Sequence, residues 1–389
     1  MHFGKLSYTL FSSTAMVRRK AFTISAFLLA LLQLGCAASH LSSPGGGPHA
    51  LSLAAVGDTT GYTIALAEGQ REGIRGLLSG KDIFVFNAEG VFSKRLHQGD
   101  CQSFRHQSLF LGPPEEIDSL PRGRITVASL ANNHVLDCGV EGMRETMQAF
   151  KEHGIMTVGA GGNLREACGP LMLDVKGFHV AVLAYFEMDQ SVFAYIGAAP
   201  EQFLAGRDKS GVASWQSCNG QERIEELRKK ADVILVLVHM HHAINSWTDT
   251  PNDASILFAK KIIDAGADIV IGSGPHVPQG IMRRDRGVSL LSLGNFLFQP
   301  RHDIPERSRR SLGVDLAISD DRINLVIVPL RLDILGQPRV ALPGDADMIL
   351  KRVASLSDQL GTPLRIRGER GYLEIQRTKG EGSSGADVR

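Results

Sequence analysis

The sequence lacks three features that would each define its class: a strong net charge, many cysteines and a long hydrophobic run. A formal net charge of +1 over 389 residues provides no global field that would recruit nucleic acid. Five cysteines are too few for a scaffold held mainly by disulfides. The apolar run at residues 21–34 is shorter than the roughly 20 residues of a membrane-spanning helix. We therefore expect no nucleic-acid partner and no polytopic membrane protein.

The composition is that of a globular protein. Hydrophobic residues make up 43% and charged residues 21% of the chain, which excludes a wholly disordered protein. The length corresponds to two or three domains of about 150 residues each, or to one large α/β domain with long loops.

The N-terminal segment has the pattern of an export signal. Arg18, Arg19 and Lys20 precede the uncharged run at residues 21–34, and small residues follow that run. The first 35 residues hold four cations and no acid, which leaves the remainder of the chain with a formal charge of −3. We therefore predict an exported and mildly acidic mature protein.

Two ways of processing this segment remain open. Residues 34–36 resemble a bacterial lipobox, in which Cys36 would be lipidated and would anchor the protein to a membrane face. Ordinary cleavage near Ala38 is the alternative. We predict a signal peptide or lipoprotein anchor at residues 1–38 and a linker at residues 39–50. Both alternatives place the mature protein outside the cytoplasm, either membrane-anchored or secreted.

Four further cysteines would then lie in an oxidising compartment. They allow two disulfides in three different connectivities, and four unpaired thiols are the alternative. These residues are Cys101, Cys138, Cys168 and Cys218.

Short apolar runs alternate with amphipathic segments along most of the chain. The predicted strands lie at residues 51–56, 82–86, 125–130, 179–185, 233–238, 268–271, 288–293, 312–318 and 323–332. Helical spacing of apolar residues predicts helices at residues 139–153 and 255–265. This alternation predicts a layered α/β fold with a largely parallel sheet, and the closely spaced later strands predict a second, antiparallel sheet. Residues 333–377 are a weakly patterned C-terminal extension, and residues 378–389 a disordered tail.

Polar side chains gather where the predicted strands end. Ligands of open α/β sheets bind outside the carboxyl ends of the strands, so these side chains should meet at one edge. Imidazole, carboxylate and amide groups suit Mn, Fe or Zn, and there are enough of them for one or two ions. Each residue alone has a plainer interpretation as a turn, a solvated loop end or a buried core histidine. The residues are Asp58, Glu89, Asn133 with His134, His239 and His276.

An ordered set of motifs across residues 51–332 resembles the bacterial CapA family. These capsule-synthesis proteins of the poly-γ-glutamate type are related to calcineurin-like metallophosphoesterases. The motifs are Gly57-Asp58, Asn87-Ala88-Glu89, Leu130-Ala131-Asn132-Asn133-His134 with Asp137-Cys138-Gly139, Gly159-Ala160-Gly161 with Asn163, His239, Asp264-Ala265-Gly266-Ala267-Asp268 with Gly272 and Pro275-His276-Val277-Pro278-Gln279-Gly280, and Ser292-Leu293-Gly294-Asn295-Phe296.

The resemblance implies a fold and a role for each matching residue. The expected fold is a four-layer α-β-β-α sandwich of the metallophosphoesterase type, in an exported and membrane-anchored protein. His134 would be the general acid, and Asn132 and Asn295 would orient the residues of the site by hydrogen bonds. The residues that would hold or adjoin the metal are Asp58, Glu89, Asn133, His239 and His276.

The chain departs from the family pattern at two places. The family usually has His-Trp-Gly followed by a glutamate, whereas this chain reads His-Met-His-His-Ala at residues 239–243. His241 would face the same side as His239 and is a candidate substitute ligand, and His242 would face the other side. Ser273 and Gly274 stand where the family usually has another histidine. These departures weaken the inference of catalysis more than the inference of the fold.

A basic segment follows the Asn295 motif. It is either a solvated loop or a rim that binds an anionic polymer or phosphate, because arginine binds carboxylate and phosphate in a bidentate manner. Its basic residues are Arg301, Arg307, Arg309 and Arg310.

Two functions compete at this point. The first is an extracytoplasmic, metal-dependent hydrolase that acts on phosphoester or related bonds in a cell-envelope polymer or its lipid-linked precursor. The second is a non-catalytic subunit that binds an anionic polymer within a membrane complex for capsule synthesis and export. A transferase or an amide-cleaving enzyme at the same site is a third alternative.

Overall fold

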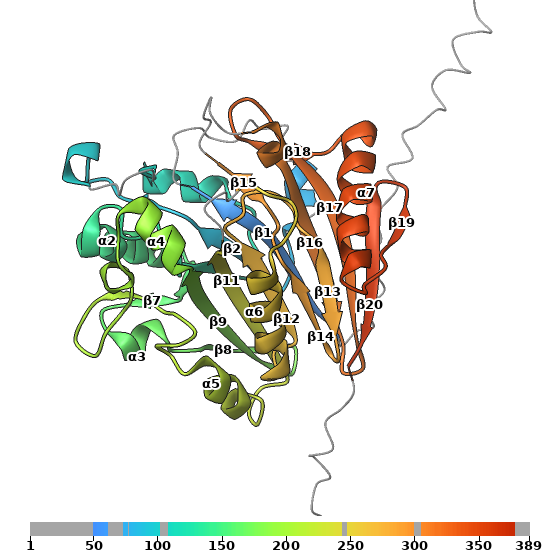
Figure 1. The fold of residues 1–389 in the computed structure, drawn as a ribbon, viewed down its shortest axis with the longest axis horizontal. Coiled ribbons are helices and arrows are strands. Elements are labelled where there is room, and N and C mark those ends of the chain that lie inside the picture. The colour runs from blue at the N-terminus through green and yellow to red at the C-terminus, as the bar shows by residue number, and fades with distance from the viewer. Residues whose placement is uncertain are drawn as a thin grey trace, which may run out of the picture. The chain divides into compact units, whose positions relative to one another are not determined.

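The computed structural model describes residues 50–60, 73–76, 78–101, 108–242, 247–298 and 305–377. Most of its residues belong to two large sheets and the helices that cover them (Figure 1). The predicted signal peptide, Cys36, the linker up to residue 49, Arg301 and the predicted tail at 378–389 lie outside the described residues.

The first sheet has ten strands. They are β1 (Leu51–Thr59), β2 (Ile83–Ala88), β5 (Ile125–Ser129), β6 (Met156–Val158), β15 (Asn295–Leu297), β16 (Arg310–Ile318), β17 (Arg322–Leu332), β18 (Pro338–Val340), β19 (Arg365–Arg367) and β20 (Arg370–Gln376). Their order is β19-β20-β17-β16-β1-β2-β5-β6, with β15 beside β1 and β18 beside β17. The strands β1, β2, β5 and β6 are parallel, and β16, β17 and β20 pair in antiparallel fashion.

The second sheet has six strands, in the order β13-β14-β12-β11-β9-β8. They are β8 (Leu171–Val175), β9 (Phe178–Met188), β11 (Val233–His241), β12 (Ile269–Ser273), β13 (Ile281–Arg284) and β14 (Gly287–Leu290). Its four central strands are parallel, and the two outermost pairs are antiparallel. Two small pairs complete the strands, namely β3 (Val91–Phe92) with β4 (Leu111–Gly112) and β7 (Ala160–Gly161) with β10 (Gly211–Val212).

Helices pack around the two sheets, the last of them against strands of both. They are α2 (Gly139–Glu152), α3 (Leu164–Ala167), α4 (Gln190–Ile196), α5 (Gly220–Leu227), α6 (Asp253–Asp264) and α7 (Pro343–Gln359), with short 3-10 turns η1 (Gln98–Asp100), η2 (Pro114–Ser119), η3 (Pro200–Gln202) and η4 (Glu306–Arg309). None of the helices in the described part of the chain is long and apolar enough to cross a membrane.

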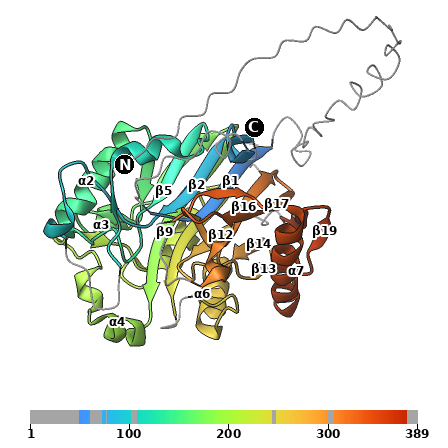
Figure 2. The ribbon, with the colours of Figure 1, turned by 90° about the horizontal axis from the view of Figure 1, so that it is seen from above.

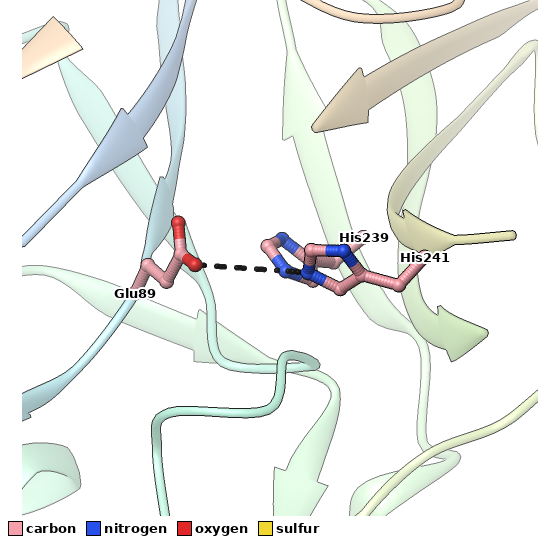
Figure 3. Close-up of side chains that lie close together, drawn as sticks. All are labelled: Glu89, His239 and His241. Carbon is pink, nitrogen blue, oxygen red and sulfur yellow. Dashed lines mark hydrogen bonds and ion pairs between the residues drawn. The ribbon is translucent and has the colours of Figure 1, made fainter. Parts of the chain in front are cut away.

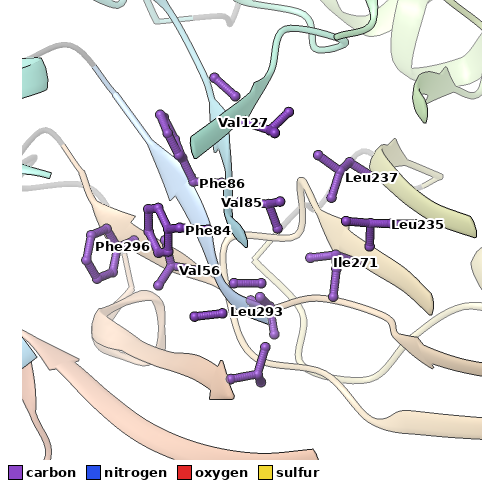
Figure 4. Packing of buried hydrophobic residues seen from close by; sticks show 14 of the residues in the cluster. Val56, Phe84, Val85, Phe86, Val127, Leu235, Leu237, Ile271, Leu293 and Phe296 are labelled. Atoms are coloured by element: carbon purple, nitrogen blue, oxygen red, sulfur yellow. The ribbon is translucent and has the colours of Figure 1, made fainter. Parts of the chain in front are cut away.

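The alternation along β11 shows how the layers pack. Leu235 and Leu237 belong to the large core between the two sheets, whereas Val236 and Val238 belong to a second core with α5 and α6. Figure 4 shows the first pair together with Ile271 of β12, near side chains of β2 and β5. A strand whose two faces are both buried must be apolar throughout, which is why residues 233–238 form a continuous apolar run.

On the other side, α2 covers the first sheet. Its Met143 and Phe150 are fully buried, and the Phe150 ring lies 5.0 Å from that of Phe92 and 6.1 Å from that of Phe86. Figure 2 shows α6 on the far side of the second sheet and α7 alongside β17 and β13. The architecture is thus the predicted four-layer α-β-β-α sandwich.

The predicted strands and helices are all present, but the predicted separate antiparallel sheet is wrong. Strand β16 pairs with β1, from Leu51 opposite Ile318 to Ala55 opposite Val314, so the later hairpin extends the first sheet. The short spacing in the sequence indicates a hairpin but not the sheet edge that it joins. Strand β1 offers a free edge there, and pairing satisfies its backbone hydrogen-bonding groups.

The four cysteines in the described part form two disulfides, Cys101–Cys138 and Cys168–Cys218. The sequence left this connectivity open among three.

Residues 333–377, where the sequence pattern is weak, contain β18, α7, β19 and β20. Strand β20 pairs with β17 from Gly371 to Gln376, so this segment contributes directly to the first sheet.

Candidate metal centre

Strand β1 delivers Asp58 to the carboxyl edge of the first sheet. Asp58 pairs in register with Asn87 of β2 on one side and Asn295 of β15 on the other. Its backbone N–H donates to the carbonyl oxygen of Gly294 at 3.0 Å. A Cβ atom at Gly57 would lie 1.7 Å from the same oxygen, so only glycine permits this close approach of the two chain segments.

Strand β11 delivers two histidines from the second sheet. His239 and His241 lie two residues apart and therefore face the same side, with their Nε2 atoms 2.9 Å apart. His242 faces the other side, where its Nδ1 lies 2.9 Å from Oγ of Ser255 on α6. The predicted orientation of these three side chains is confirmed.

The loop after β12 supplies His276. Its φ of 57° is left-handed, and Gly274 two residues earlier has a φ of 106°. The Nδ1 atom of His276 lies 3.1 Å from Oδ2 of Asp58 and 2.9 Å from Oδ1 of Asn295. The ring therefore directs its Nε2 atom toward Glu89.

Glu89 lies at the centre of these groups and is fully buried. Its Oε1 atom is 3.8 Å from Nε2 of His134, 3.7 Å from Nε2 of His239 and 3.6 Å from Nε2 of His276. Figure 3 shows its carboxylate directed toward His239 and His241. Within the described ranges neither carboxylate oxygen has a hydrogen-bond partner. A buried carboxylate without donors is costly, and a cation would compensate that cost.

The donor atoms form two overlapping sets. One set is Glu89, His239 and His241, and the other is Asp58, Glu89 and His276. Within each set the donor atoms lie within 4.8 Å of one another, and all the residues are buried. Imidazole nitrogen with carboxylate oxygen is a donor combination that Mn, Fe and Zn accept. The residues therefore fit two candidate ion positions that share Glu89.

The two carboxyl groups of the site respond differently to their surroundings. Burial by itself would raise the pKa of Asp58, but hydrogen bonds and charge from His239 and His276 hold that pKa well below its usual value. Burial and the neighbouring charge of Asp58 raise the pKa of Glu89 well above its usual value. Burial, followed by the charges of His239 and His276, lowers the pKa of His241 well below that of free histidine. Burial likewise lowers the pKa of His239.

His134 approaches the centre from the loop after β5. Its Nδ1 lies 2.9 Å from Oδ2 of Asp137, and the same oxygen accepts the backbone N–H of Phe110 at 2.8 Å. The Phe110 ring packs 4.3 Å from the imidazole, centroid to centroid. Asn132 shapes the loop, because its Oδ1 accepts the backbone N–H groups of His134 and Val135. Nε2 of His134 thus faces Glu89 and the centre.

Asn133 completes the set of predicted site residues. Its Oδ1 lies 2.9 Å from Nε2 of His239. The structure therefore brings together all the residues that the sequence placed at this site, from both sheets.

A model of the family described as bacterial capsule synthesis protein PGA_cap matches residues 63–300. The chain belongs to this family. It is 32% identical over 237 residues to the capsule biosynthesis protein CapA of Bacillus anthracis, which covers 60% of this chain and 54% of that protein. It is 32% identical over 185 residues to the PGA biosynthesis protein CapA of Bacillus subtilis (strain 168), covering 47% and 45%.

A probable polyglutamine synthesis accessory protein of Mycobacterium tuberculosis is 31% identical over 275 residues, covering 67% of this chain and 70% of that protein. The chain thus spans about half the length of the two Bacillus relatives. Among solved structures, a novel phosphatase from Mycoplasma pneumoniae aligns with a TM-score of 0.38 at 10% identity, over 84% of this chain and 94% of that one. That likeness is too weak to support an argument about activity.

Three supporting residues of this PGA_cap chain have roles that the sequence did not reveal. The Nδ2 atom of Asn87 lies 2.8 Å from Oδ1 of Asp58 and 3.0 Å from Nδ1 of His239, so Asn87 links the two sheets across the site. Ser273 places its Oγ 3.0 Å from the same Nδ1. Asp137 positions His134. Asn87 and Asp137 lie within the same motifs as Glu89 and His134. Their position next to these site residues was the only sequence signal for their roles.

The basic segment of this PGA_cap chain is only partly beside the site. Arg307 hydrogen-bonds through Nε to the carbonyl oxygen of Trp247, whose ring packs 4.8 Å from that of His276. Arg310 lines a small cavity with Val277 and Pro278, the residues that follow His276. Arg309 instead pairs with Glu306 at 3.5 Å. Of the basic residues of this segment that the structure describes, Arg307 and Arg310 therefore border the site.

Proposed function

We propose that this PGA_cap member is an exported, metal-dependent hydrolase that cleaves phosphoester or related bonds in an anionic cell-envelope polymer or its precursor. The observation that carries the proposal is the buried Glu89 carboxylate, which has no hydrogen-bond donor among the described residues and faces three imidazole nitrogens. Such an arrangement is unfavourable without a cation and suitable with one.

Five side chains would hold one or two divalent ions. When bound, an ion would supply a Lewis acid that stabilises negative charge on an oxygen of the scissile group. The side chains themselves fix the geometry, because Asn295 orients His276 and Asn87 orients both Asp58 and His239. The five residues are Asp58, Glu89, His239, His241 and His276.

His134 is the proposed general acid. Asp137 engages its Nδ1, which leaves Nε2 as the atom that delivers a proton to the leaving oxygen. The Phe110 ring covers one face of the imidazole and restricts its rotation. His134 is 4% exposed, so bulk water has little access to the proton on Nε2.

The proposed compartment and polymer rest on separate observations. The basic and apolar N-terminal pattern favours export, and the two disulfides favour an oxidising compartment. The name of one relative, a PGA biosynthesis protein, favours an acidic polymer of the poly-γ-glutamate type, whose amide linkages would be the related bonds that the protein cleaves.

The proposed activity can be tested with an aryl phosphate in the presence of Mn²⁺, Fe²⁺ or Zn²⁺. We expect metal-stimulated cleavage by the wild-type protein, and loss of cleavage in the His134→Gln variant with its metal content unchanged. Replacement of His153, a histidine that pairs with Asp118 on the surface at 2.8 Å, is the matched control and should retain activity. Absence of metal-stimulated cleavage by the wild-type protein would contradict the hydrolase assignment.

A non-catalytic polymer-binding subunit is the second candidate. The observation that favours it is that Ser273, whose Oγ lies 3.0 Å from Nδ1 of His239, belongs to neither candidate ligand set, although the resemblance would imply a further histidine at position 273 or 274. Capsule production distinguishes the two, because a cell whose protein carries His134→Gln should lose capsule if hydrolysis is required and keep it if binding alone suffices.

A further inference from the structure

A basic groove lies beside the strands at the β19 end of the first sheet. It has a volume of about 610 Å³ and lies among β17, β19, β20 and the end of β13. Among the described residues that line it, Arg283, Arg365 and Arg367 are cationic and Glu374 alone is acidic. Most of the lining residues lie beyond residue 300, where the family match ends.

Several arginines elsewhere on the described surface are held by acidic partners. Arg284 pairs with Asp264, and Arg322 pairs with Asp321. By contrast, no side-chain hydrogen bond or ion pair joins the guanidinium groups of Arg283, Arg365 or Arg367 to any residue that the structure describes. Three unpaired guanidinium groups around one groove are a site for carboxylate or phosphate oxygens.

The sheet arranges these groups in a row. Arg365 and Arg367 lie two residues apart on β19, so they share one face of the strand. Tyr372 stands opposite Arg365 on the neighbouring strand, and Val326 stands opposite Tyr372 on β17. Charged groups at the spacing of every second residue of a strand suit an extended chain with repeated acidic groups.

Two further features favour an amide-linked chain. The groove is also lined by Asn324 and Gln376, whose amide groups can pair with amides of a ligand. Strand β19 is the last strand of the sheet order, so its outer backbone edge is available to an added extended chain. All three residues of β19 are exposed, and Ile366 is 40% exposed.

The groove is separate from the candidate centre. Asn324 pairs with Ala317 of β16, which pairs in turn with Ser52 near the start of β1, whereas Asp58 lies near the end of β1. Strand β20 is three strands away from β1, which at about 4.8 Å per strand is about 14 Å across the sheet.

We propose that this groove is a second binding site for an extended acidic polypeptide, which holds the polymer on the protein surface by its carboxylates. The inference rests on the proposed function, in which an anionic amide-linked polymer is the ligand. It adds a binding site that is independent of the metal centre and of Arg307 and Arg310.

The test measures the affinity of the full-length protein for a labelled poly-γ-glutamate oligomer by fluorescence anisotropy. In the triple variant Arg283→Gln, Arg365→Gln, Arg367→Gln we expect binding to weaken by at least about tenfold, because three charge-assisted contacts are lost. The matched control is Arg95→Gln, Arg284→Gln, Lys351→Gln, which removes the same charge from exposed and already paired residues and should bind like the wild type.

The outcomes separate this proposal from the proposed function. An equal loss in both triple variants, or no loss in either, would overturn the groove assignment and leave the hydrolase assignment untouched. Equal or tighter binding of polyphosphate of the same charge would show that the groove recognises phosphate chains, which also overturns it. The groove variant should cleave an aryl phosphate at the wild-type rate. If the wild-type protein does not cleave an aryl phosphate, that result counts against the hydrolase assignment and not against the groove.

Discussion

The Nδ1 atom of His134 lies 2.9 Å from the Oδ2 atom of Asp137, and both side chains are buried beside Glu89. This contact fixes which nitrogen of the imidazole faces the candidate centre. It also makes Asp137 a positioning residue, because Asp137 acts through His134 and has no place in either set of candidate metal ligands.

We therefore predict that Asp137→Asn lowers the rate of aryl-phosphate cleavage by about 10- to 100-fold, as loss of an orienting partner usually does. The bound metal should be unchanged, and the loss should fall on kcat and not on KM, because Asp137 orients the imidazole and does not touch the substrate. Asp118→Asn removes a comparable partner from the surface residue His153 and serves as the control. A wild-type kcat in Asp137→Asn would contradict the role assigned to this pair.

Gly57 should tolerate no side chain. A Cβ atom there would lie 1.7 Å from the carbonyl oxygen of Gly294, so β15 would have to move away from β1. We expect Gly57→Ala to lower the free energy of unfolding by about 3 kcal/mol or more, measured by denaturant unfolding. Gly344→Ala is the control, because that position in α7 has open space and alanine favours a helix. Equal stability of the two variants would refute the close approach.

The buried carboxyl group of Glu187 should make the stability of the protein depend on pH. Burial raises its pKa to about 7, despite the opposing charge of Lys261 and with a smaller contribution from Asp189. The folded state thus binds this proton more tightly than the unfolded state, and stability is lost as the pH rises from about 4.5 through about 7. Glu187→Gln should therefore match the wild type at pH 4 and exceed it by up to about 3 kcal/mol at pH 8.

Thermal unfolding of Glu187→Gln across this pH range is the measurement. Glu222→Gln, which removes an exposed carboxylate from the same region, should follow the wild-type curve. A stability difference that is the same at pH 4 and pH 8 would show that the carboxyl group of Glu187 does not titrate as described.

The disulfide between Cys168 and Cys218 closes a loop with a sequence separation of 50 residues. Loop-closure entropy predicts that the double variant Cys168→Ala, Cys218→Ala loses about 2–4 kcal/mol of stability. The wild-type protein should lose a similar amount, or more, when both disulfides are reduced. Unfolding curves that are identical with and without reductant would indicate that the disulfides do not form.

Strands that are buried on both faces could be predicted from the sequence alone. Residues 233–238 are apolar throughout because both faces of β11 are buried, and such runs are visible without any partner. The strand nevertheless continues to His241, because the two histidines at its end are buried by the site and not by an apolar core. Sequence periodicity cannot distinguish a buried ligand from a loop.

Features that depend on pairing between distant residues could not be predicted. The joining of β16 to β1 depends on which strand edge is free, and the disulfide connectivity depends on the fold of the loops. The roles of Asn87 and Ser273 depend on two sheets meeting at one point. The position of Glu89 at the end of a strand was visible, whereas its lack of hydrogen-bond donors among the described residues was not.

The metal content of the purified protein tests the central claim most directly. The wild-type chain and its Glu89→Gln variant should be analysed by elemental mass spectrometry after equilibration with Mn²⁺, Fe²⁺ and Zn²⁺. Glu141→Gln, which changes an exposed glutamate paired with Arg95, is the control. The account predicts one or two bound ions in the wild type and the control, and a loss of bound ions in Glu89→Gln because both ligand sets share that residue. A wild-type protein without bound metal, or a Glu89→Gln variant with undiminished metal, would contradict it.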